Sequence, residues 1–559
     1  MMAMNLLRQR LNSLRCRAVE LQTCLRRWAL YNDQVPHDWK APLLGRMTPA
    51  EESAFQADLE LTRTRLRPVS AQIQTVMKWY EFVLEQVLAR LDHAAALQEQ
   101  SRGRECVAAL ADLEARLIEP NEETLGFFFR CLAQHASHEY HQKLGAIDAI
   151  LRSLYLPTAK TAHQRGLLSR EALSRTPLAF VTDDAESIHS WRHHAMVSSR
   201  CGRQLPLSLV TIPRRRLAEP WNLVDLAFEV GRCLQDDLNL ESEIAARIQS
   251  GAASWTGDSS FWTISSRLWA CWSSVVFADV FATIKLGPAY LSGTIEKWSA
   301  SPATVAALTP TSESPPPLIR WQVMIQALHL LNLADSANQW ERTLRQTFGD
   351  FERYGASLGA AWGRWTMDCR AVAQLAAFTP LTALGMARLV DVAEPFLASD
   401  AQRGQRVREW LLASDASGAS EQDFRWIESG GDSRMPAHIA LSGLRAAYDV
   451  ACDAETAGRL WIRFWRLMQH LATSCDAVRE QEDREFAPAD NTLRQIAQQS
   501  IPASHVPART MMGISPLAPG MGALTAFPIG VSGPIFSPSC GVVQPVDNAM
   551  GRPHQPTPQ

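Results

Sequence analysis

Residues 221–232 read Trp221-Asn-Leu-Val-Asp-Leu-Ala-Phe228-Glu229-Val-Gly-Arg232, and residues 272–279 read Trp272-Ser-Ser-Val275-Val-Phe-Ala278-Asp279. Pro220 stands directly before the first stretch, and Gly287-Pro288 follows the second as a breaker near its end. The two stretches are predicted to be helices over about residues 221–238 and 265–286. We expect them to pack together so that positions 228, 232 and 275 converge, and this pair decides the fold of the centre of the chain.

The two stretches are similar to the metal-binding helices of the thermolysin-like zinc metallopeptidases (gluzincins), whose patterns are H-E-x-x-H and E-x-x-[AS]-D. Histidines at i and i+4 lie on one helix face and reach one zinc ion, and a carboxylate on the second helix is the third ligand. The resemblance covers residues 178–330. It rests on Pro220-Trp221, Glu229, Gly231, Trp272, Ala278-Asp279 and Gly287-Pro288-Ala289.

The resemblance implies that all three zinc ligands have been replaced in this chain. Phe228 and Arg232 stand where the family has its histidines, and Val275 stands where it has its glutamate. A phenyl ring and an isopropyl group offer no lone pair, and a guanidinium does not deprotonate. Glu229 and Asp279 remain, as the family's general base and as the residue that orients a ligand histidine. We expect no bound metal, no cofactor and no catalysis, and a pairing of Arg232 with Glu229 or Asp279.

Two groups of histidines are alternative metal sites. His135, His138 and His141 lie on a helix predicted over about 122–155, at spacings of three residues. His189 and His193 have the i, i+4 spacing of a zinc pair. Exposed or packing histidines are the default interpretation of both groups.

Composition excludes two broad classes of protein. The chain has 559 residues with a formal net charge of −3, so no overall basic character points to nucleic acid. No uncharged apolar run reaches the roughly 18–20 residues that a membrane span needs, and the nearest one, 268–286, contains Asp279 and Lys285. The 11 scattered cysteines favour reduced thiols and a cytoplasmic location.

The pattern along the chain predicts a mainly α fold with a small β element. Apolar runs at 178–181 and 207–212 are predicted strands. The expected regions are a helical N-terminal region (1–165), a degenerate metallopeptidase-like core (166–300), a linker or loop (301–317), a C-terminal helical region (318–487) and a disordered Pro/Gly/Met-rich tail (488–559). Helices are predicted, among others, at about 382–398, 401–413 and 437–485.

These observations predict a catalytically inactive, metallopeptidase-like protein that acts by binding other proteins or as an assembly subunit. One alternative is a hydrolase with a relocated histidine-based metal site. The other is a purely structural helical scaffold, with the likeness accidental. The positions of residues 228, 232 and 275 distinguish the last alternative from the first interpretation.

Overall fold

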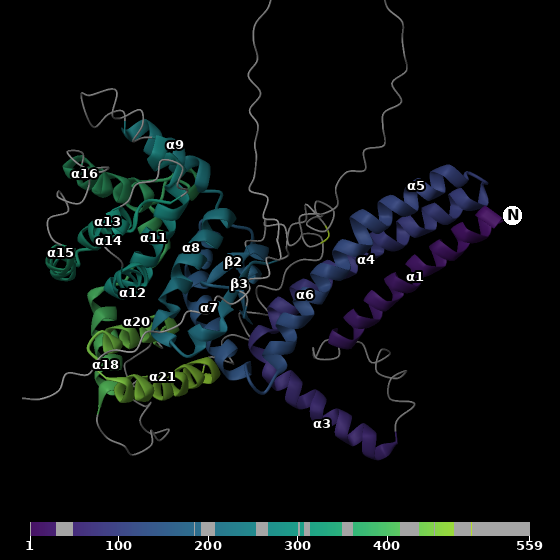
Figure 1. The fold of residues 1–559 in the computed structure, drawn as a ribbon, viewed down its shortest axis with the longest axis horizontal. Coiled ribbons are helices and arrows are strands. Elements are labelled where there is room, and N and C mark those ends of the chain that lie inside the picture. Colours follow the sequence, from purple (N-terminus) through teal and green to yellow (C-terminus); the bar gives the residue numbers. More distant parts are fainter. Residues whose placement is uncertain are drawn as a thin grey trace, which may run out of the picture. The chain divides into compact units, whose positions relative to one another are not determined.

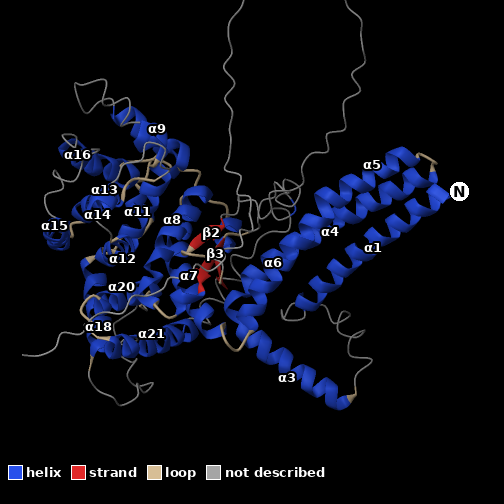
Figure 2. Cartoon of the chain, in the orientation of Figure 1, coloured by secondary structure: helices blue, strands red, loops and turns tan. Residues whose placement is uncertain are grey.

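The computed structural model describes residues 2–29, 48–183, 185–191, 207–252, 267–299, 302–306, 314–348, 362–413, 435–451, 453–474 and 494. All described residues belong to one compact unit, Met1–Ala503. As predicted, the fold is mainly α with one small sheet (Figure 2). The predicted disordered tail lies outside the described residues, apart from Arg494. Within the described part, no helix is long and apolar enough to cross a bilayer.

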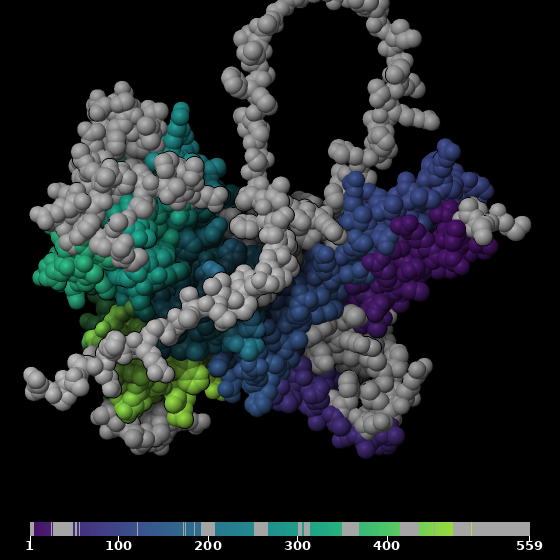
Figure 3. Space-filling model, viewed as in Figure 1, coloured from purple at the N-terminus to yellow at the C-terminus, as the bar shows by residue number. Residues whose placement is uncertain are grey.

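The N-terminal helices pack side by side around a small core of their own (Figures 1 and 3). The apolar stripe of α1 (Met2–Ala29) faces α4 (Ser70–Glu99) and α5 (Gly103–Leu113), which confirms the helical spacing read from the sequence. The basic face of α1 is partly neutralised, because Arg17 bonds both Glu114 and Glu122. The remaining elements of this region are α3 (Pro49–Leu66), η2 (Arg67–Val69), the π-helical turn η3 (Glu114–Ile118) and α6 (Glu119–Ala136).

The sheet contains both predicted strands and one that the sequence did not reveal. Strands β1 (Leu178–Thr182) and β3 (Leu209–Pro213) run parallel, and β2 (His189–Trp191) pairs antiparallel with β3 on its other side. The central strand β3 is buried along its whole length. A buried central strand explains why its sequence is largely apolar rather than alternating, and the hydroxyl of its one polar residue, Thr211, donates to the His189 carbonyl oxygen.

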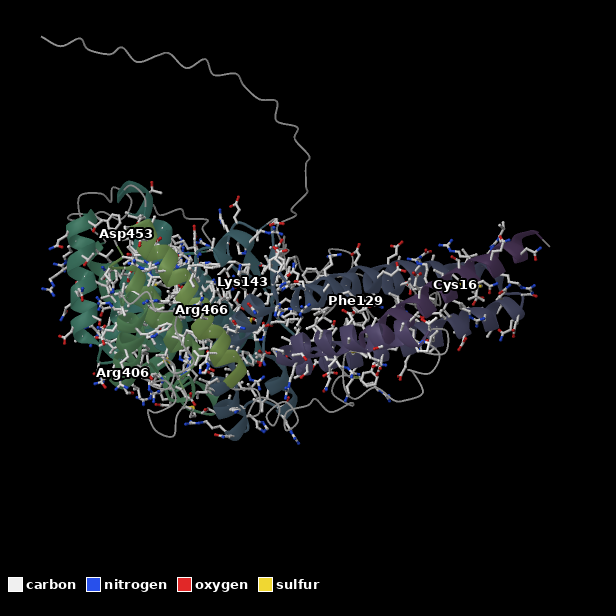
Figure 4. All side chains as sticks on the ribbon, turned by 90° about the horizontal axis from the view of Figure 1, so that it is seen from below. Cys16, Phe129, Lys143, Arg406, Asp453 and Arg466 are labelled. Atoms are coloured by element: carbon white, nitrogen blue, oxygen red, sulfur yellow. The ribbon has the colours of Figure 1, made fainter. Side chains whose placement is uncertain are left out.

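Helices surround this sheet and continue to the end of the described part. In chain order they are α7 (His141–Gln164), η4 (Arg170–Arg175), η5 (Arg214–Leu217), η6 (Pro220–Val224), α8 (Asp225–Asp237), α9 (Glu241–Ala252), α11 (Ser273–Leu286), α12 (Pro288–Trp298), α13 (Pro302–Ala306), α14 (Pro317–Leu330), α15 (Ala334–Phe348), α16 (Trp362–Ala373), η9 (Gln374–Phe378), η10 (Thr382–Leu384), α17 (Leu389–Val392), α18 (Ala398–Leu412), α20 (Ala437–Tyr448) and α21 (Ala454–Ser474). One apolar core extends from Tyr140 to Leu471 and includes residues of both the 166–300 and 318–487 regions. Helix α21 packs on α7; Figure 4 labels Arg466 on the first and Lys143 on the second.

Several predicted boundaries are wrong. The helix expected over 437–485 is two helices, α20 and α21, with a non-helical break after Tyr448. The helix expected over 122–155 is two helices, because Ser137 is extended and its hydroxyl accepts the Tyr140 N–H. The helix expected over 382–398 is a short turn and a one-turn helix, interrupted by Gly385 in the left-handed conformation (φ 58°). The expected linker 301–317 contains the short helix α13.

Candidate functional site

Helices α8 and α11 pack tightly against each other, as the sequence predicted. A Cβ placed on Gly231 would lie 3.0 Å from Cδ1 of Phe281 and 3.2 Å from the Cα of Ala278. One turn further along, the Ser274 hydroxyl donates to Oε1 of Gln235 at 2.8 Å. Gly231 therefore has a packing role, because a side chain at this position would push the two helices apart.

Asp279 is the most buried charge at this contact, with no exposed surface. It receives two hydrogen bonds from Arg320 of α14, from Nε to Oδ2 and from Nη2 to Oδ1, both at 2.7 Å. The hydroxyl of Tyr290 on α12 donates to Oδ1 at 2.8 Å. Three helices are thus joined through one carboxylate, and both of its oxygens are satisfied.

The guanidinium of Arg320 lies against two aromatic rings. Its central carbon is 4.0 Å from the centroid of Trp298 and 5.2 Å from that of Phe228. Phe228 is the residue at the first expected ligand position, so this position and Asp279 meet at a single cation. Contacts of this kind stabilise a guanidinium that has lost much of its water.

The electrostatics of the cluster favour a charged arginine and a neutral tyrosine. Burial by itself would lower the pKa of Arg320, but the charge and hydrogen bonds of Asp279 raise it above its ordinary value. Burial raises the pKa of Tyr290 far above its ordinary value, and the charge of Asp279 adds to this effect. Tyr290 therefore stays protonated and donates to the carboxylate.

Glu229, the expected general base, is turned toward the sheet instead. Its Oε2 accepts hydrogen bonds from the backbone N–H of Ser190 at 2.9 Å and from the Ser190 hydroxyl at 2.5 Å. Glu229 is buried. The residue fixes α8 to β2, and this role is structural.

The predicted pairing of Arg232 is wrong. Asp279 is engaged by Arg320 and Tyr290, and Glu229 by Ser190. Arg232 is half-buried; its Nε lies below the surface with no hydrogen-bond partner within the described residues. The cation that bonds Asp279 comes from a third helix, α14. Val275 is half-buried.

The alternative site of His135, His138 and His141 does not form in the described part. His135 is buried: Nε2 lies 2.8 Å from Oδ2 of Asp148, and Nδ1 lies 2.9 Å from the carbonyl oxygen of Cys131. Burial would lower the pKa of His135, but Asp148 more than offsets this and raises it. Both ring nitrogens are therefore occupied, and the helix break at 137–140 separates His135 from His141.

The remaining histidines lie nearer the surface. The rings of His138 and His141 are 6.1 Å apart, and Nδ1 of His141 is 3.0 Å from the Ser137 carbonyl oxygen. His189 is exposed on β2, and His193 lies outside the described residues. Across the described ranges, no group of three or more His, Cys, Asp or Glu residues is arranged to hold a metal ion.

Sequence reasoning missed Arg320, although one signal marked it. Arg320 is the only charged residue in the sequence of α14, PLIRWQVMIQALHL, which is otherwise strongly apolar and almost entirely buried. A single charge in such a helix needs a buried partner. The partner, Asp279, is 41 residues away along the chain, and no local pattern connects the two.

Comparisons of the chain with protein-family models, with curated proteins and with solved structures found no match.

Proposed function

We propose that this chain is a non-catalytic protein of metallopeptidase descent that acts by binding protein. The observation that carries the proposal is the cluster around Asp279. In the metallopeptidases, the aspartate at the position of Asp279 would orient a metal-ligand histidine. Here Asp279 bonds Arg320 instead, and the Arg320 guanidinium lies beside Phe228, which stands at the first expected ligand position.

The chemistry of this cluster disfavours a divalent cation. Arg320 stays positively charged and repels a second cation at the same place. Asp279 has both oxygens engaged, and Phe228 and Val275 supply no donor atoms. Structural zinc is typically worth about 10–16 kcal/mol, and it needs several such donors to gain that energy. Here the arginine takes over the structural part of that role.

The protein-binding half of the proposal rests on two points. The expected zinc ligands at positions 228, 232 and 275 are replaced, and the helices of the N-terminal region pack separately. Helices α1, α4 and α5 pack around a small core of their own. We therefore expect them to offer their outer faces to a partner. If so, cross-linking of the full-length chain in native extract will connect α1, α4 or α5 to one recurring protein. Cross-links confined to the chain itself would favour the purely structural alternative.

The metallopeptidase descent can be tested by restoring the ligands. We would combine Phe228→His, Arg232→His and Val275→Glu with Arg320→Ala, which removes the competing cation. If the three positions converge, the fourfold variant will bind about one zinc ion per chain, measured by metal analysis after dialysis.

The matched control keeps Phe228 and carries the other three changes, and it should bind zinc far more weakly. A fourfold variant that folds, as judged by circular dichroism, but takes up no zinc would refute the descent. The non-catalytic half has a separate test. Stoichiometric zinc in the unmodified protein, lost in Glu229→Gln, or chelator-sensitive cleavage of a peptide library, would overturn it.

A further inference from the structure

A second feature of the fold, separate from the Asp279 cluster, is a cavity of about 320 Å³. It lies between the α11–α12 junction, the α14–α15 turn, α18 and α20. Much of its wall is apolar and includes Leu286, Pro288, Leu333, Phe396 and Val450. Cavities of about 300 Å³ and above are large enough to enclose a small organic molecule.

Arg408 of α18 is the cation of this cavity. It is half-buried, and its Nη1 donates to Oε1 of Gln405 at 3.0 Å. Its Nε is buried and has no hydrogen-bond partner among the residues that the structure describes. No ion pair of Arg408 occurs within the described part of the chain, so its charge has no protein counter-ion there.

Asp449, a carboxylate that lines the same cavity, is already bonded to other side chains. The Ser292 hydroxyl oxygen lies 2.7 Å from both carboxylate oxygens of Asp449 and donates its one proton to this carboxylate, which also pairs with Nη2 of the buried Arg445 at 2.8 Å. Arg445 also bonds Glu296, so its one guanidinium is shared by two carboxylates. Among the described residues that line the cavity, Arg408 is therefore the cation without an ion pair, and it lies beside an apolar wall.

We propose that this cavity binds a small organic monocarboxylate with an apolar body. A guanidinium recognises a planar carboxylate well. A partly buried cation is stabilised most by a counter-ion that binds it away from bulk water. The apolar body would contact Leu286, Phe396 and Val450. A dianion such as phosphate fits less well, because Arg408 is the one cation without an ion pair among the described lining residues, and Asp449 repels a second negative charge.

The test uses the full-length protein and three probes, namely hexanoate, 3-phenylpropionate and indole-3-acetate. Binding is followed by ligand-observed NMR, which detects dissociation constants in the millimolar range, and by calorimetry. We expect at least one probe to bind saturably at one site per chain. Its neutral isostere, the corresponding alcohol or amide, should bind at least about tenfold more weakly, as should inorganic phosphate.

Two variants of one helix separate the site from general surface charge. Arg408→Gln should weaken the binding of the probe at least about tenfold. Arg406→Gln removes the same charge from an exposed position on α18 and should leave binding unchanged (Figure 4). Ala446→Phe, which fills the cavity from α20, should also abolish binding and guards against misfolding of the Arg408 variant. Failure of all three probes to bind, or equal binding by wild type and Arg408→Gln, would overturn the proposal.

Discussion

Removing the arginine at the centre of the Asp279 cluster should strongly destabilise the fold. In Arg320→Met the side chain keeps most of its length and its contact with Trp298, but Asp279 loses two of its three hydrogen bonds. Asp279 has no exposed surface, so water cannot replace the lost donors. Breaking a buried ion pair by removing one partner costs about 3–5 kcal/mol, and we expect a loss of that size.

The measurement is urea unfolding followed by tryptophan fluorescence. Arg232→Met is the control, because Arg232 has no ion pair in the described structure, and its loss should cost less than about 1 kcal/mol. The double variant Arg320→Met/Asp279→Leu removes both charges and should recover most of the loss, because a pair of apolar residues often replaces a buried ion pair without penalty. An Arg320→Met loss below about 1 kcal/mol, or a double variant no more stable than the single one, would show that the pair is not the main buried electrostatic contact here.

Two further changes test the surroundings of this cluster. Burial lowers the pKa of Lys285 to about 8, so between about pH 8 and 10 the unfolded chain binds more protons than the folded one. Stability should therefore rise with pH across this window, by up to about 3 kcal/mol, and urea midpoints measured against pH should show a flatter profile in Lys285→Met. Gly231→Ala should cost about 1–3 kcal/mol by crowding Phe281, whereas Gly145→Ala, where a Cβ meets nothing within 4 Å, should be neutral or stabilising. Equal effects of the two glycine changes on the melting temperature would contradict the close packing of α8 and α11.

Much of the fold could be predicted from local sequence pattern. The apolar stripe of α1, the apolar runs of β1 and β3, and the helices that became α8 and α11 all carry signals within a few residues. Strand β2 could not be found in this way, because His189-Ser-Trp191 is short and its only buried residue is a serine. That serine is buried because it bonds Glu229, a contact with a residue 39 positions away.

The candidate site was harder to predict for the same reason. The sequence places Phe228, Glu229 and Asp279 on predicted helices, but the cation that bonds Asp279 comes from α14. The sequence predicts a pairing of Arg232 because this arginine lies three residues after Glu229 on the same helix. A helix such as α8 presents residues to several neighbours, and the spacing alone does not say which neighbour brings the opposite charge.

The positive charge that bonds Asp279 belongs to Arg320, a residue of the chain, so this contact does not depend on an ion from the surroundings. A metal ion is taken from the surroundings, so a protein that uses one gains stability only in proportion to the supply of that ion. The guanidinium of Arg320 is synthesised with the chain and cannot be extracted by a chelator or exchanged for another cation. The contact between Arg320 and Asp279 therefore forms as the chain folds, from groups that the chain itself carries.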